Sequence, residues 1–208
     1  MVAEGLIEVA FDCRSQLGPL AARGRAKPFH FVSSIAVFAP GAVGEDEVTW
    51  EDSPLDATDE LFAGYAETKW VAEKIVRLAG ERGVPFTIHR PGVVAGHSET
   101  GAGNTSDLVW NAFKGSIQLG AAIEDMGRLD VTPVDYVARA IVHLALREES
   151  LGRAFHYPNP QPADWDEVFE VVRGMGYPLR MLPYPTWKRE LLAADHRGED
   201  NALLPFLP

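Results

Sequence analysis

Residues 60–92 read ELFAGYAETKWVAEKIVRLAGERGVPFTIHRPG, a long helical pattern followed by a short strand. Aliphatic residues at helical spacing predict one apolar face for a helix over residues 60–79, formed by Val71, Ile75 and Leu78. Two glycines follow and end that helix. Residues 85–90 are predicted as a strand, closed by a Pro-Gly pair.

The same pattern continues on either side of this stretch. Residues 29–32 are an apolar run typical of a buried parallel strand, and residues 154–157 predict a third strand. Strand, long helix and strand form a βαβ unit, which favours a right-handed parallel crossover. Further helices are predicted over residues 2–23, 107–114 and 183–194, and others are predicted to begin at the cap residues Thr132 and Asp164.

We therefore predict the α/β class, with a parallel sheet within residues 1–157 and a small helical region after it. Residues 158–208 are expected to form the helical region.

Composition excludes several functional classes. The 208 residues carry a net charge of −11, which disfavours nucleic-acid binding, and no apolar run approaches the ~20 residues that span a bilayer, so no membrane association is expected. The single cysteine, Cys13, allows no internal disulfide and is consistent with a cytoplasmic protein. The histidines lack metal-ligand spacing, so no metal is predicted. The acid-rich stretch 45–60 is interpreted as a solvated loop.

Tyr65 and Lys69 lie four residues apart in the predicted helix, so their side chains share one face with Cβ atoms ~5–6 Å apart. An ammonium that close favours the phenolate form of the tyrosine, which can then exchange a proton with a carbonyl or alcohol oxygen. The lysine also has donors for the ribose hydroxyls of a nicotinamide cofactor.

Such a pair also occurs by chance on exposed helices, so its context decides its meaning. Ser33 and Ser34 follow the strand 29–32 directly, and Pro91 and Gly92 follow the next strand. Ligands in open α/β sheets bind beyond the carboxyl ends of the strands. The simpler role for at least one of the serines is capping of the strand end.

Four segments taken together resemble the extended short-chain dehydrogenase/reductase superfamily: PFHFVSSIAVF, GYAETKWVAEKIV, FTIHRPGVVAG and TPVDYVARAIVHLA. The resemblance covers nearly the whole chain. It implies a partial Rossmann-like parallel sheet, with residues 1–157 as an incomplete catalytic portion, residues 92–130 as an inserted substrate loop and residues 158–208 as a helical region on the substrate side. Within that superfamily, RPGVVAGHSETGAGNTSD and HRGEDNALLPFLP most resemble thioester reductase domains, which are related to carboxylic acid reductases and fatty acyl reductases.

The resemblance implies release of an acyl chain from the phosphopantetheine of an acyl or peptidyl carrier protein, as an aldehyde or an alcohol, with NADPH as reductant. It assigns the catalytic roles to Ser34, Tyr65 and Lys69. It assigns cofactor binding to Ser33, Tyr65, Lys69, Pro91, Gly92 and Val93. Position in the loop and the helix that follows suggests substrate contact for His97, Trp110 and Phe113.

One element of the resemblance is missing. Full-length relatives begin with a strand and a TGxxGxxG turn that holds the cofactor pyrophosphate, and this sequence contains no such turn. Gly101-Ala102-Gly103 comes after the third motif and is rejected as a phosphate loop. We therefore expect an N-terminally truncated domain that binds NADPH weakly or not at all by itself, with a missing N-terminal segment as a partner.

Two other functions are weighed against the reductase. A non-catalytic fragment or interaction module that keeps the fold would explain the missing turn. A sugar-nucleotide epimerase or dehydratase of the same superfamily would share the catalytic residues. The sequence of the loop over residues 92–107, however, resembles that of the reductases. The acyl substrate, the choice between NADPH and NADH, and the product are not set by the sequence.

Overall fold

The computed structural model describes residues 27–38, 48–55, 61 and 63–206. The chain divides into two compact units: residues 1–94 with 135–158, and residues 95–134 with 159–208. Residues 95–130 of the predicted inserted loop fall in the second unit, together with residues 159–208. The predicted helix over residues 2–23 lies outside the described residues.

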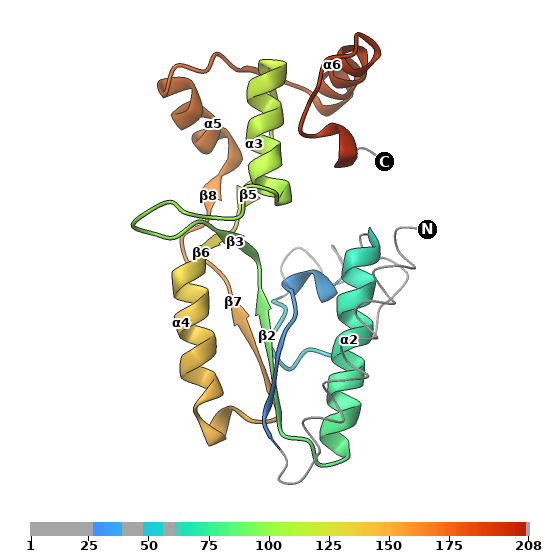
Figure 1. The fold of residues 1–208 in the computed structure, drawn as a ribbon, viewed down its shortest axis with the longest axis vertical. Coiled ribbons are helices and arrows are strands. Elements are labelled where there is room, and N and C mark those ends of the chain that lie inside the picture. Colours follow the sequence, from blue (N-terminus) through green and yellow to red (C-terminus); the bar gives the residue numbers. More distant parts are fainter. Residues whose placement is uncertain (1–26, 39–47, 56–60, 62, 207–208) are drawn as a thin grey trace. The chain divides into compact units, whose positions relative to one another are not determined.

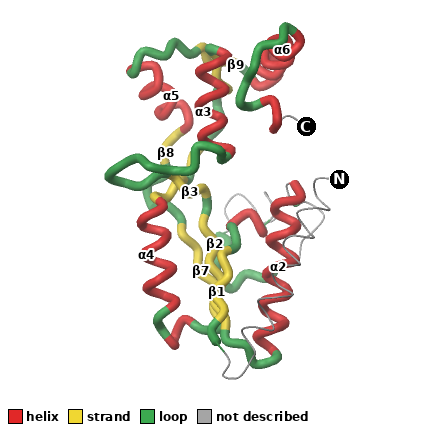
Figure 2. The backbone as a smooth tube through the Cα atoms, in the orientation of Figure 1, coloured by secondary structure: helices red, strands yellow, loops and turns green. Residues whose placement is uncertain are grey.

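The first unit contains a three-stranded parallel sheet in the order β1-β2-β7. Its elements are β1 (Phe29–Val32), the 3-10 turn η1 (Ile35–Val37), α2 (Ala63–Glu81), β2 (Phe86–Pro91), α4 (Val134–Ala145), η2 (Glu148–Ser150) and β7 (Arg153–Tyr157). The three predicted strands and the α/β class are confirmed. Helices α2 and α4 lie on opposite sides of this sheet (Figures 1 and 2).

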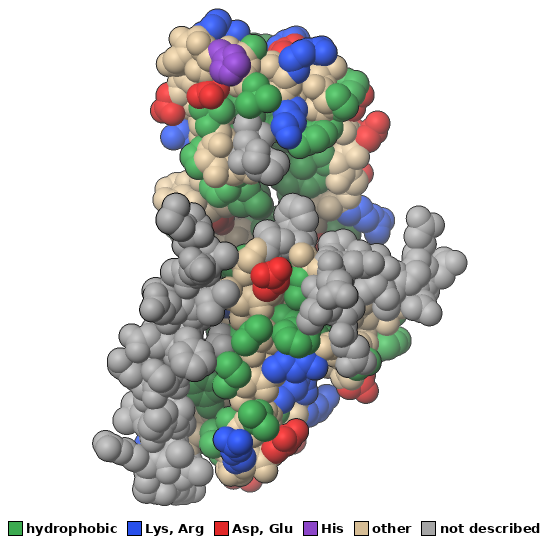
Figure 3. All heavy atoms as spheres, turned by 90° about the vertical axis from the view of Figure 1, so that its right-hand side faces the viewer, with side chains coloured by type: hydrophobic (Ala, Val, Ile, Leu, Met, Phe, Trp, Pro, Cys, Tyr) green, Lys and Arg blue, Asp and Glu red, His purple; other side chains and the backbone are tan. Residues whose placement is uncertain are grey.

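Helix α2 packs on the sheet through a different face from the one predicted. Its buried residues are Ala66, Ala72, Glu73 and Val76. Val71 and Leu78, expected in the core, are 47% and 46% exposed. Small alanines allow the helix to approach the strands closely, and Glu73 is drawn inward by a buried arginine. Figure 3, which looks at the α2 side, shows hydrophobic side chains exposed among charged ones.

The described part of the second unit contains four helical segments and short strands. Its elements are α3 (Leu108–Leu119), β4 (Ala121–Ile123), β5 (Arg128–Leu129), β6 (Val131–Pro133), β8 (Ala163–Asp164), α5 (Trp165–Gly174), β9 (Arg180–Leu182), α6 (Tyr184–His196) and η3 (Leu204–Phe206), while β3 (Val93–Ala95) begins in the first unit and ends in this one. Strands β4 and β9 are parallel, and β5 and β8 antiparallel.

Two side-chain features specify helices of this unit. Asp164 starts α5 with the predicted capping box, in which Glu167 bonds back to the cap backbone. Helix α3 begins after Asp107, whose carboxylate accepts the Trp110 N–H, and runs five residues beyond its predicted end to Leu119. Within the described part of the chain, no helix is long and apolar enough to cross a membrane.

Replacing Gly115 with alanine is expected to destabilise the second unit by about 1–3 kcal/mol. The new Cβ would lie 2.6 Å from Asn201 Oδ1 and 2.7 Å from Leu203 Cγ, so the C-terminal segment would have to shift. That segment is anchored here, because buried Asn201 Nδ2 donates to the Gly115 carbonyl at 2.9 Å. Urea unfolding measures the loss.

The matched control is Gly174→Ala at the end of α5, where nothing lies within 4 Å of the added atom. There the higher helix propensity of alanine should leave stability equal or raise it by up to ~1 kcal/mol. Equal effects of the two substitutions would show that the close packing at Gly115 does not hold the C-terminal segment.

Candidate active site

Tyr65 and Lys69 lie in the first two turns of α2, and the lysine joins this helix to the sheet. Lys69 Nζ donates a hydrogen bond to the carbonyl of Val32, the last residue of β1, at 2.9 Å. The same ammonium lies 5.8 Å from the centre of the Tyr65 ring. Tyr65 is 53% exposed, so its phenol can reach a ligand while the lysine holds the helix against the strand end.

The serine pair follows that strand end directly. The Ser33 N–H donates to the His89 carbonyl at 2.7 Å, and the Ser33 hydroxyl is buried with no hydrogen-bond partner among the described residues. The Ser34 hydroxyl accepts the Ala36 N–H at 3.2 Å and so caps η1. Ser34 therefore has the capping role weighed for one of the serines, and its O–H proton can still be donated.

The segment Pro91-Gly92-Val93 reaches the same edge of the sheet. Strands β1 and β2 are parallel, with Val32 opposite His89, so their carboxyl ends lie together. Pro91 is the last residue of β2 and is buried, while Val93 is 36% exposed. The first unit thus brings the serine pair, the Tyr-Lys face of α2 and this segment to one edge.

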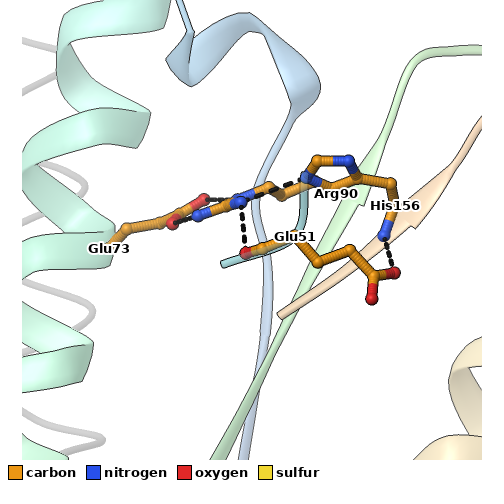
Figure 4. A network of polar contacts seen from close by, with 4 residues as sticks. All are labelled: Glu51, Glu73, Arg90 and His156. Atoms are coloured by element: carbon orange, nitrogen blue, oxygen red, sulfur yellow. Dashed lines mark hydrogen bonds and ion pairs between the residues drawn. The ribbon is translucent and has the colours of Figure 1, made fainter. Parts of the chain in front are cut away.

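A buried ion pair, which the sequence interpretation missed, lies one helical turn beyond Lys69. Glu73 accepts two hydrogen bonds from Arg90, 2.9 Å from Nε and 2.6 Å from Nη2, and neither side chain is exposed (Figure 4). Arg90 Nη1 also donates to the Glu51 carbonyl at 3.2 Å and to His156 Nε2 at 3.1 Å. One guanidinium therefore ties α2, the loop around residue 51, β2 and β7 together.

The signal for this pair was present in the sequence. Tyr65, Lys69 and Glu73 are spaced four apart, which places the carboxylate on the same face of α2 as the predicted pair. Arg90 directly precedes the Pro-Gly segment, so the ion pair fixes the helix carrying Tyr65 relative to that segment. Glu51 is half-buried and its carboxylate accepts the His156 N–H at 2.9 Å, so this acid of the stretch 45–60 is not simply solvated.

A second polar chain crosses the sheet. His30 Nδ1 pairs with Thr87 Oγ1 at 2.7 Å, Thr87 Oγ1 with His89 Nε2 at 2.8 Å, and His89 Nδ1 with the Tyr157 hydroxyl. Burial lowers the pKa of His89 to about 4, and the neighbouring His30 acts in the same direction. Burial also raises the pKa of Tyr157. Both groups are therefore neutral in the folded protein near pH 7.

Acidification is expected to weaken the fold through His89. The unfolded chain takes up a proton on this histidine below its ordinary pKa of ~6.5, whereas the folded protein keeps it neutral down to a pH of about 4. The free energy of unfolding should therefore be highest above pH ~6.5 and should fall, by up to about 3 kcal/mol, as the pH is lowered toward 4. Urea unfolding at about pH 7, 5.5 and 4.5 measures this.

His89→Gln should reduce this pH dependence, because the group with the largest shift is gone, while His30 and His156, whose pKa values burial also lowers, remain. His143→Gln provides the control, since His143 is exposed on α4 and should not change the slope. An unaltered slope in the His89 variant would rule out this histidine as the source of the acid sensitivity.

The three predicted substrate residues lie in the second unit. The His97 ring stays within its own loop, where Nδ1 accepts the Glu99 N–H at 3.2 Å. Trp110 is 38% exposed on α3. Phe113 packs with Trp165 and Phe169, at ring-centre distances of 5.5 and 5.9 Å. Phe113 thus has a packing role, and substrate contact by these residues stays a prediction. No group of three or more potential metal-binding side chains occurs in the described ranges.

Over residues 4–141 the sequence matches the NAD-binding family described as male sterility protein. The chain belongs to this family. It is 40% identical over 168 residues to a subunit of the linear gramicidin synthase of Brevibacillus parabrevis, a match that covers 81% of this chain and 3% of that protein. It is also 40% identical over 173 residues to the glycine betaine reductase ATRR of Emericella nidulans, covering 81% of this chain and 13% of that protein.

A solved structure agrees with this family assignment. The terminal R domain from the myxalamid PKS-NRPS biosynthetic pathway is 48% identical and has a TM-score of 0.78, covering 86% of this chain and 45% of that one. The predicted resemblance to reductase domains is confirmed. The chain spans less than half the length of this structure and a small part of the curated relatives.

Proposed function

We propose that this chain is the catalytic part of a larger thioester reductase, which releases an acyl group from a carrier-protein phosphopantetheine as an aldehyde or alcohol. The observation that carries the proposal is the hydrogen bond from Lys69 Nζ to the Val32 carbonyl. It places the Tyr-Lys face of α2 beside the serine pair at the carboxyl edge of the sheet, where ligands of α/β folds bind.

The residues at this edge fit the nicotinamide end of a cofactor. The buried Ser33 hydroxyl has no partner in the described part of the chain, and Tyr65 and Val93, on the segments that reach the same edge, are exposed. Lys69 would hold the ribose, and Pro91 to Val93 would flank the ring. Bound there, the nicotinamide supplies the hydride. NADPH is the form that the family resemblance implies.

Two side chains of this protein would stabilise and protonate the carbonyl oxygen of the thioester. As the thioester carbon gains a hydride, its oxygen gains negative charge, which Ser34 and Tyr65 stabilise by donating hydrogen bonds. Tyr65 then transfers its proton to that oxygen. When the C–S bond of the resulting hemithioacetal breaks, the hydroxyl proton passes to the departing sulfur, so the carrier thiol leaves and an aldehyde is released. Tyr65 regains its proton from solvent.

The test uses the complete polypeptide that contains these 208 residues. It is supplied with an acylated carrier protein and either NADPH or NADH, and the product is trapped and identified by mass spectrometry. Aldehyde or alcohol formed only when thioester and NADPH are both present supports the proposal. Cofactor oxidation that is independent of the thioester, or conversion of a sugar nucleotide instead, would contradict it.

A further inference from the structure

A cavity of about 700 Å³ lies in the first unit, beside the buried ion pair. It is lined by the loop over residues 48–52, by Arg77 of α2, and by β7 with the residues that flank it. Its volume is within the range of ~300–1,000 Å³ typical of small-molecule sites. Arg77 is eight residues beyond Lys69 on the same helix, about 12 Å along its axis. The cavity is thus distinct from the predicted active site.

Two guanidinium groups that line this cavity have no acceptor among the described residues. Arg77 is half-buried, and burial and the neighbouring Arg90 lower its pKa, partly offset by the carboxylate of Glu73. Arg153 begins β7 and lies over the Phe155 ring, with its guanidinium carbon 5.3 Å from the ring centre. Neither arginine has a hydrogen bond or ion pair within the ranges that the structure describes. A half-buried guanidinium such as that of Arg77 normally has an oxygen acceptor, and the exposed Arg153 is accessible beside the same cavity, so both can bind a ligand.

Two carboxylates line the same cavity. One oxygen of Glu51 accepts the His156 N–H at 2.9 Å, which fixes the carboxylate beside β7 (Figure 4). Asp52 is exposed next to it. Among the described residues, neither carboxylate forms an ion pair with Arg77 or Arg153. The cavity lining therefore includes two guanidinium groups and two carboxylates that form no ion pairs with one another in the part of the chain that the structure describes.

An exposed indole completes the lining. Trp50 is 66% exposed and Val48 61%. The Trp50 backbone is held in a tight turn, with its N–H donating to Ser53 Oγ at 2.8 Å and its carbonyl accepting the Ser53 N–H at 3.1 Å. Large apolar surface at a charged cavity favours a ligand that also carries an aromatic or apolar group.

A ligand with only a negative charge would be repelled by the two carboxylates, and a ligand with only a positive charge would be repelled by the two guanidinium groups. A zwitterion satisfies both. We propose that this cavity binds a free amino acid with an aromatic or apolar side chain. Its carboxylate pairs with Arg77 and Arg153 in the forked geometry that arginine favours. Its ammonium group faces Glu51 and Asp52, and its side chain lies against Trp50. This site is independent of the reductase proposal.

Calorimetry on the complete chain with L-phenylalanine tests the site directly. Binding is expected, and N-acetyl-L-phenylalanine and phenethylamine, which lack the ammonium and the carboxylate respectively, should each bind about 10-fold more weakly or worse. No binding of L-phenylalanine would overturn the proposal. Equal binding of either single-charge analogue, or of inorganic phosphate, would overturn the assignment to a zwitterion.

Variants locate the binding. Arg77→Gln and Arg153→Gln should each weaken L-phenylalanine binding by about 10-fold, and because Arg153 is exposed, its variant is expected to fold even if the other does not. Arg82→Gln is the matched control, an exposed arginine just after α2 that does not line the cavity. Wild-type affinity in Arg153→Gln, or equal losses in all three variants, would show that the cavity is not the site.

Discussion

Replacing Tyr65 with phenylalanine is expected to lower turnover of the thioester by about 10²–10⁴-fold, the usual contribution of a positioned general acid. The substitution removes one oxygen from a side chain that is 53% exposed, so the stability of the fold should hardly change. Lys69 keeps its hydrogen bond to the Val32 carbonyl at 2.9 Å, so cofactor affinity should stay nearly unchanged. Steady-state kinetics and NADPH titration of the complete polypeptide separate these effects.

Tyr136→Phe provides the matched control, because Tyr136 lies on α4 of the same unit and is 51% exposed. It should keep wild-type turnover. Near-normal turnover in the Tyr65 variant would remove this residue from the mechanism. A parallel loss of cofactor affinity and turnover would instead give Tyr65 a binding role.

Breaking the buried ion pair should have the largest effect on stability. Glu73→Leu leaves the Arg90 guanidinium uncompensated in a site with no exposure, which typically costs about 3–5 kcal/mol. Glu67→Leu, at an exposed position of the same helix, should change the free energy of unfolding by only about 0.5 kcal/mol. Urea unfolding at neutral pH measures both.

The double variant Glu73→Leu with Arg90→Met separates stability from positioning. Replacing both charges with apolar side chains is often neutral or stabilising, so the double variant should regain most of the stability that the single one loses. Its turnover should still fall, because the two hydrogen bonds that join α2 to the end of β2 are lost and only the Lys69 contact and apolar packing position the helix. A double variant that is as unstable as Glu73→Leu would show that lost packing, and not the unpaired charge, is responsible.

The sheet was predictable because its strands are short apolar runs bounded by turn residues. The gathering of these residues at one edge was predictable, because the serine pair and the Pro-Gly segment each follow a strand end and parallel strands bring such ends together. Their catalytic roles stay a proposal. The capping box at Asp164 was predictable for the same reason, since it depends only on residues three apart.

Features that depend on packing could not be predicted in this way. Periodicity predicted an apolar face for α2 that excludes Glu73. The face buried against the sheet instead contains Ala66, Ala72 and Glu73, because the Glu73 carboxylate has a buried arginine partner that compensates its charge. Nothing in the acid-rich stretch distinguishes Glu51 from its neighbours until β7 places a backbone N–H beside it. The cavity at Arg77 likewise combines segments that are distant in the sequence.

The most direct test of the central claim is the transfer of deuterium from labelled NADPH to the product. The complete polypeptide is mixed with an acylated carrier protein and NADPH deuterated at the transferable position, and the released aldehyde is analysed by mass spectrometry. The account predicts one deuterium per aldehyde with the wild-type protein and almost no product with Tyr65→Phe. Unlabelled aldehyde, or an acid released by hydrolysis in its place, would contradict reductive release at this site.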